Sequence, residues 1–177
     1  MQQSFFHYYF RVSLFSLILF STSCQKENRF DCFKSTGETI VEDRFTESFT
    51  GLDISDNINA FITQSSQSSL RVEAGKNIIE SISTEVKDGI LYLKNSNKCN
   101  WMRDYDRKVN VYISSDHINN ITYRGFGEIK TVGTYTGKHF LVEMWMASGS
   151  MQLDLDCESV YLKAHTGPAD IICSGKA

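Results

Sequence analysis

Asp154 and Asp156 are the one regularly spaced pair of carboxylates on a strand that the sequence predicts. They alternate with leucines, so both would lie on the outer face of that strand. Glycoside hydrolysis needs two carboxylates held about 5–9 Å apart, and such a pair could also bind a cation weakly. No basic residue or metal-binding cluster joins them, so the sequence favours a solvated face and no catalytic residue.

Other groups that could do chemistry are isolated. The histidines His117, His139 and His165 lack a second ligand at metal-site spacing, which predicts no metal site. Gly125-Phe126-Gly127 lacks the third glycine and the helix of a nucleotide-binding loop. No serine lies in a GxSxG elbow. We therefore expect a protein that is not an enzyme and that needs no cofactor.

The N-terminal segment 1–23 has the layout of a secretory signal. Arg11 precedes the apolar run Val12–Phe20, which is shorter than the roughly 20 residues of a membrane-spanning helix. Small residues then precede Cys24, and this arrangement resembles a bacterial lipobox, in which the cysteine thiol receives a diacylglycerol. Ser21 stands where a lipobox usually has an aliphatic residue, so an ordinary cleaved signal with an incidental cysteine is the alternative.

These observations predict the organisation of the chain. We expect a lipoprotein signal at 1–23, a tether and N-terminal segment at 24–40, and one domain at 41–177. Lipidation of Cys24 would anchor the protein in the outer membrane, facing the periplasm or the cell surface. The formal net charge of −3 and the pI near 5.8 argue against nucleic-acid binding.

Four further cysteines would meet an oxidising compartment after export. Cys32 and Cys99 lie in polar, loop-like surroundings, and we expect a disulfide between them that contributes about 2–4 kcal/mol. Cys157 and Cys173 could form a second disulfide or remain as two buried thiols.

The segment around Trp101 mixes aromatic rings with arginine between two predicted strands. Trp101, Arg103 and Tyr105 are therefore candidate ligand-binding residues, because such side chains dominate binding hot spots and sugar faces stack on aromatic rings. A solvated loop with one buried tryptophan is the alternative.

Period-two alternation of apolar residues dominates from Val41 onward and predicts strands. The alternating segments are 52–54, 58–62, 70–74, 90–94, 109–113 and 160–162. Asp88-Gly89 between apolar runs predicts a tight hairpin, and the spacing of 76–82 fits a short helical turn.

Three segments of the C-terminal half align with one another at offsets of 22 and 20 positions: 123–129, 145–151 and 165–171. Each reads aromatic or His, any residue, small, any residue, small, polar, apolar. A period of about 20 residues predicts an all-β solenoid, with small residues at tight corners or close backbone approaches. A β-sandwich is the alternative. Tyr123, Trp145 and His165 would form either an internal stack or a surface strip, which makes Tyr123 and Trp145 candidate ligand-binding residues.

Several segments resemble the family called "putative auto-transporter adhesin, head GIN domain". They are Phe49–Gln64, Arg71–Asn77, Glu85–Leu91, Val109–Ile113, Ile121–Ile129 and His165–Ile171. The resemblance implies a right-handed β-helix of short strands and an exported protein, often a lipoprotein, of Bacteroidetes-type bacteria. It carries over no catalytic residues.

Family members usually continue through further coils after the segment at 165–171. No polar cap follows Ile171-Ile172 here, although a solenoid needs one to cover its last apolar face. The sequence therefore predicts either a truncated family member or an end covered by a partner or a second copy.

The combined prediction is a lipid-anchored, non-catalytic binding module, adhesin-like, with a glycan, protein or other surface ligand. The first alternative is a structural or assembly lipoprotein that docks on a partner or self-associates through its C-terminal end. A polysaccharide-acting enzyme comes last.

Overall fold

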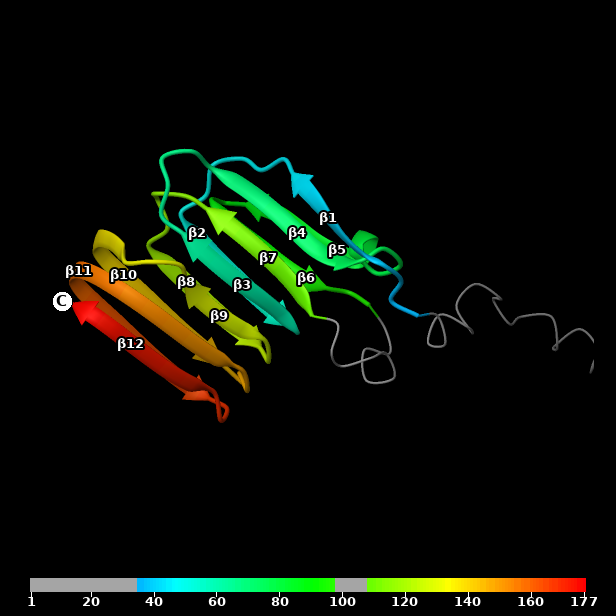
Figure 1. Ribbon diagram of the computed structural model, residues 1–177. Coiled ribbons are helices and arrows are strands. Elements are labelled where there is room, and N and C mark those ends of the chain that lie inside the picture. Colours follow the sequence, from blue (N-terminus) through cyan, green and yellow to red (C-terminus); the bar gives the residue numbers. More distant parts are fainter. Residues whose placement is uncertain (1–34, 98–107) are drawn as a thin grey trace, which may run out of the picture. The chain divides into compact units, whose positions relative to one another are not determined.

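The computed structural model describes residues 35–97 and 108–177 (Figure 1). Every described element belongs to the unit Cys32–Ala177. Within the described ranges there are twelve strands and no α-helix. The all-β class predicted from the alternation of apolar residues is therefore confirmed.

The bounds of the elements are β1 Thr39–Arg44, β2 Gly51–Asp56, β3 Ile58–Thr63, β4 Ser69–Gly75, η3 Ile79–Ser81 (a 3₁₀ turn), β5 Ile82–Lys87, β6 Ile90–Asn95, β7 Val109–Ser114, β8 Asn120–Gly125, β9 Glu128–Thr131, β10 Tyr135–Trp145, β11 Ser150–Thr166 and β12 Asp170–Lys176.

The described strands form one hydrogen-bonded sheet with two parallel series. We call β7, β3, β9, the first half of β11 and β12 the front ladder. We call β6, β2, β8, β10 and the second half of β11 the rear ladder. Figure 1 shows the front ladder, extended by the antiparallel β4 and β1, lying across the view. Eight of the eleven described pairings are parallel.

The alternation of apolar residues gives both ladders one buried face. Leu52 and Ile54 of the rear ladder, and Ala60 and Ile62 of the front ladder, belong to one buried cluster. Full burial of a leucine or isoleucine side chain contributes about 1.5–3 kcal/mol. Each pair of consecutive strands therefore stabilises the next through its inward side chains.

Short corners join the rear strands to the front strands, at Phe126–Gly127, Met146–Gly149 and Gly167–Ala169. The offsets between the aligned segments recur in the pairing, because Glu128 lies opposite Ser150 and Ser150 opposite Asp170. A Cβ on Gly149 would overlap the carbonyl oxygen of Gly127 and the Tyr123 hydroxyl. The predicted close backbone approach at the small positions is confirmed.

The predicted Asp88-Gly89 hairpin is also confirmed. β5 and β6 are antiparallel, and the two turn residues have φ of 52° and 75°. Positive φ at both central residues is the type I′ geometry that suits the twist of a two-residue hairpin. The predicted helical turn is η3, which spans Ile79–Ser81.

β12 and the second half of β11 form one edge of the sheet, and β12 pairs with β11 alone among the described strands. The inward side chains there lie beside a hollow of about 260 Å³ that includes Val160, Leu162 and Cys173. Leu162 is 45% exposed. This edge, which we call the open edge, leaves part of the apolar interior in contact with solvent.

Cys157 and Cys173 form no disulfide, and only Cys157 is buried. Neither the predicted second disulfide nor the predicted pair of buried thiols is therefore fully confirmed. Cys173 lies opposite Leu153, four residues from Cys157 along β11, which is about 13 Å. A disulfide needs Cα atoms about 4.4–6.8 Å apart, so register prevents a bridge. Loss of hydration raises the pKa of the Cys157 thiol and, through partial desolvation, that of the exposed Cys173 thiol. Cys24, Cys32 and Cys99 lie outside the described residues.

Candidate functional site

Exposed apolar side chains gather where β8, β10 and the second half of β11 end in the rear ladder. These apolar side chains are Phe126, Trp145 and Met146; together with the polar Arg124 and His165 beside them, we call the group the outer-corner patch. β8 and β11 both pair with β10 in parallel, so these strand ends lie next to one another. Phe126 is 53% exposed, Trp145 39% and Met146 78%.

Alternation along β10 places Trp145 on the outer side. Tyr123 of β8 pairs with Met144 of β10, and the ladder with β11 is irregular between Met144 and Trp145. Side chains alternate along a strand, so Trp145 faces the side opposite to Met144. The extra residue lies on β11, between the partners of Met144 and Trp145. Tyr123 and Met144 therefore point inward, and Trp145 points outward.

Tyr123, which the sequence suggested as a ligand-binding residue, is fully buried. Its hydroxyl donates a hydrogen bond to the Gly127 carbonyl at 2.7 Å. Burial raises the pKa of Tyr123 to about 12, because the phenolate would lose its hydration. The structure thus divides the predicted aromatic series: Tyr123 lies in the core, and Trp145 and His165 lie outside.

Trp145 and His165 form a stacked pair with ring centroids 3.5 Å apart and planes inclined by 9°. Met146 has φ of 50°, a conformation in which non-glycine residues are uncommon, and its N–H donates to the Thr166 hydroxyl at 3.0 Å. The corner therefore holds a stacked aromatic pair next to an exposed methionine.

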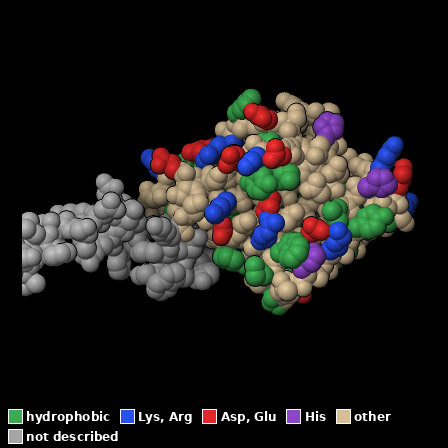
Figure 2. All heavy atoms as spheres, turned by 180° about the vertical axis from the view of Figure 1, so that it is seen from behind, with side chains coloured by type: hydrophobic (Ala, Val, Ile, Leu, Met, Phe, Trp, Pro, Cys, Tyr) green, Lys and Arg blue, Asp and Glu red, His purple; other side chains and the backbone are tan. Residues whose placement is uncertain are grey.

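The charges around the patch are largely compensated. Arg124 forms an ion pair with Asp53, which is almost buried on β2. Lys163 pairs with Glu143 at 3.0 Å. Figure 2, the view from behind, shows basic and acidic side chains interspersed, with hydrophobic groups between them. Contact through rings and apolar surface is therefore the chemistry this patch offers.

The predicted residues Trp101, Arg103 and Tyr105 lie outside the described residues. Asp154 and Asp156 alternate with buried leucines on β11, as expected. Asp154 accepts a hydrogen bond from the Thr134 hydroxyl at 2.7 Å. Across residues 35–97 and 108–177, no three His, Cys, Asp or Glu side chains converge as metal ligands.

Sequence reasoning missed a polar cleft that contains His117 and His139. These residues are 22 positions apart, one more than the offset at which β8 pairs with β10. A spacing close to the repeat period was the available signal, because similar positions in consecutive repeats lie near one another. The cleft lies near the start of β10, whereas Trp145 lies at the end of the same strand.

Several solved structures share this fold. A "putative adhesin" from Bacteroides fragilis is 23% identical with a TM-score of 0.67; 76% of this chain and 61% of that one are covered. A "putative adhesin" from Parabacteroides distasonis is 18% identical with a TM-score of 0.67, covering 77% and 57%. A "Putative lipid binding protein" from the same species is 14% identical with a TM-score of 0.61, covering 80% and 69%.

The chain thus spans about three fifths of the length of the two structures described as putative adhesins. Among curated proteins, none matches the sequence. No described helix is long and apolar enough to span a membrane. A family model matches residues 48–177, which include most of the described residues. The protein belongs to the family described as "Putative auto-transporter adhesin, head GIN domain".

Proposed function

We propose that the protein is a non-catalytic binding module of the cell envelope that holds its ligand at the outer-corner patch. The observation that carries the proposal is the exposed Trp145–His165 stack beside Phe126 and Met146. Exposed apolar clusters and aromatic anchors are typical of binding surfaces. The family description and the adhesin-described neighbours are consistent with this role.

We expect Trp145→Ala to weaken ligand binding at least tenfold, because loss of a central aromatic anchor costs about 2 kcal/mol or more. The measurement is surface plasmon resonance of the purified protein over host mucins, extracellular-matrix proteins and capsular polysaccharides.

Tyr92→Ala is the matched control, since Tyr92 is an exposed aromatic residue on β6 of the same ladder. Any ligand found in this panel should bind Tyr92→Ala and the unmodified protein with equal affinity. Equal binding by Trp145→Ala and the unmodified protein would contradict the assignment of the patch.

The fold proposed for this module is a right-handed β-solenoid. The parallel front and rear ladders, and the recurrence of the repeat offsets in their pairing, support it. The strands of a β-sandwich pair mostly in the antiparallel direction. Antiparallel pairings are the minority among the described strands. In a solenoid, the outer-corner patch would lie along one longitudinal edge.

Lipid anchoring through Cys24 is part of the same proposal, with a signal at 1–23, a tether at 24–40 and the domain at 41–177. We further propose a Cys32–Cys99 disulfide, and Trp101, Arg103 and Tyr105 as additional contacts to the ligand. The lipid anchor, the disulfide and the three additional contacts are supported by the sequence alone, since their residues lie outside the described ranges.

We expect protease added to intact cells to digest the unmodified protein, and Cys24→Ala to release it from the membrane fraction. The reason is that the lipid would be its only attachment to the outer membrane. Immunoblots of whole cells, membranes and medium provide the measurement. Survival of the protein until the outer membrane is opened would contradict surface exposure and favour a periplasmic binding role.

The open edge favours a second candidate function, that of an assembly protein. Leu162 and Cys173 are exposed there although they share a side of the sheet with buried residues. Edge strands that carry exposed apolar side chains tend to pair with another chain. A second copy of this chain could cover the edge.

We expect Leu162→Asp to keep the protein monomeric at concentrations where the unmodified protein associates, because a buried carboxylate opposes docking. Sedimentation velocity across a hundredfold concentration range would measure this. A monomer at every concentration of the unmodified protein would rule out self-association.

A further inference from the structure

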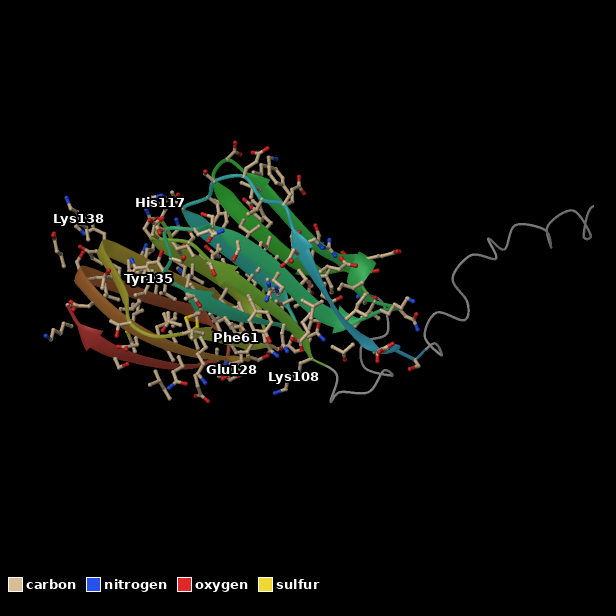
Figure 3. All side chains as sticks on the ribbon, turned by 45° about the horizontal axis from the view of Figure 1, so that its top comes forward. Phe61, Lys108, His117, Glu128, Tyr135 and Lys138 are labelled. Atoms are coloured by element: carbon tan, nitrogen blue, oxygen red, sulfur yellow. The ribbon has the colours of Figure 1, made fainter. Side chains whose placement is uncertain are left out.

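A polar cleft of about 430 Å³ lies between the loop that follows β7 and the first half of β10. Its lining includes Asp116, His117, Asn119, Lys138, His139 and Tyr161. Figure 3 shows His117 and Lys138 at the same end of the strands, with Tyr135 further inside. The volume of the cleft falls within the range typical of small-molecule sites.

Buried hydrogen bonds hold the loop wall in place. The fully buried Tyr135 hydroxyl accepts a hydrogen bond from the Ile118 N–H at 2.8 Å and donates one to the Ser115 carbonyl at 3.0 Å. The Tyr135 ring packs edge-on against Phe140, with centroids 5.8 Å apart. The loop that carries Asp116, His117 and Asn119 is therefore fixed to the core.

The opposite wall is fixed as well. The Gln64 carboxamide accepts hydrogen bonds from the N–H and the hydroxyl of Thr136, both at 2.9 Å, and donates one to the Thr136 carbonyl at 2.8 Å. His139 Nδ1 lies 2.7 Å from the Ser159 hydroxyl. Two rigid walls mean that a ligand would lose little affinity to ordering of the protein.

The side chains on these walls combine an aromatic ring with planar polar groups. Tyr161 is 59% exposed at one side of the cleft. Asn119, Asn120 and His139 offer amide and imidazole groups, which can both donate and accept hydrogen bonds. Sugars present apolar C–H faces and hydroxyl rims, and this combination of ring and polar groups is complementary to both.

The charges in the cleft add a preference for an acidic group. Asp116 lies beside His117, whose Nε2 is 3.0 Å from the carboxylate. Lys138 has no acidic partner within ion-pair distance among the described residues. A lysine ammonium without a partner is a ready donor for a carboxylate.

We propose that the polar cleft binds a carboxylated saccharide residue, with Tyr161 against the sugar face and Lys138 on the carboxylate. This site is separate from the outer-corner patch, so the two can fail independently. A phosphorylated ligand is less suited, because the cleft has one lysine, no arginine and no glycine-rich loop among the residues that line it.

The test is isothermal titration of the purified full chain with glucuronic acid and N-acetylneuraminic acid, with glucose and sodium acetate as further probes. We expect Lys138→Gln to weaken binding of the acidic sugars about tenfold, or about 1.4 kcal/mol, and to leave glucose unchanged. Tyr161→Ala should weaken binding of acidic and neutral sugars alike. Lys94→Gln, an exposed lysine on β6, is the matched control for charge.

Failure of both acidic sugars to bind the unmodified protein at millimolar concentrations would overturn the proposal. Acetate binding as tight as glucuronate would also overturn it, because the site would then be a simple anion site. Trp145→Ala should bind glucuronate normally. Loss of glucuronate binding in that variant would assign the sugar to the outer-corner patch instead of the cleft.

Discussion

Replacing Gly149 with alanine is expected to lower the free energy of unfolding by about 3 kcal/mol. The new Cβ would overlap the Gly127 carbonyl oxygen and the Tyr123 hydroxyl, and the first of these belongs to the backbone of the neighbouring corner. Neither can move without breaking the hydrogen bonds that link the corners: Tyr123 to Gly127, and Ser150 N–H to Gly127. Urea denaturation followed by circular dichroism measures the effect.

Gly137→Ala is the matched control. Gly137 also lies in the C-terminal half, but a Cβ there would meet a single atom, the Cys157 sulfur, at an ordinary 3.7 Å. We expect its free energy of unfolding to change by no more than about 0.5 kcal/mol. If the two variants were equally stable, close approach at the corners would not be what requires a small residue.

Tyr135→Phe is expected to lower the free energy of unfolding by about 2 kcal/mol. The change leaves the ring in the core but removes the hydroxyl, so the Ile118 N–H and the Ser115 carbonyl lose a buried partner. An unsatisfied buried group costs more than an ordinary hydrogen bond contributes. The released loop should also bind glucuronic acid more weakly, which titration would show alongside urea denaturation.

Tyr112→Phe serves as its control, because the Tyr112 hydroxyl donates to Glu73 at 3.0 Å on the exposed side of the sheet. Water can replace that partner, so we expect a change of about 0.5 kcal/mol or less. If Tyr135→Phe were as stable as Tyr112→Phe, the position of the loop would not depend on the buried hydroxyl.

The sequence was most informative where local chemistry dictates structure. The Asp88-Gly89 turn requires positive φ at two residues, and few other pairs adopt it readily. The small residues at the corners were predictable for a similar reason, because backbone contact leaves no room for a side chain. Alternation then placed the core residues of β2, β3 and β7 correctly.

Trp145 shows where such reasoning ends. An alignment of repeats by residue type matched Trp145 with Tyr123, whereas the strands pair Tyr123 with Met144. The corner after β8 has two residues and the corner after β10 has four, so an alignment of residue types across the corners shifts the strands out of register. A one-residue difference in register decides whether an aromatic ring is core or surface.

The polar cleft was missed for another reason. His117 lies in a loop and His139 in a long strand, so no short motif contains both. The buried Tyr135 hydroxyl ties the loop to β10, and Gln64, far away in the sequence, fixes the start of β10. Sites of this kind follow from tertiary contacts and not from local pattern.

The position of β2 and β3 in the ladders has a consequence for how the chain acquires its structure. Each lies between two strands that come much later in the chain, so neither is fully paired until β8 and β9 are present. Pairings between distant segments slow folding, to about milliseconds or seconds for β-rich domains. During that interval both edges of the central strands are open, and the nascent chain is exposed to aggregation. A chaperone that shields residues 51–63 during export would therefore protect the protein at its most vulnerable stage.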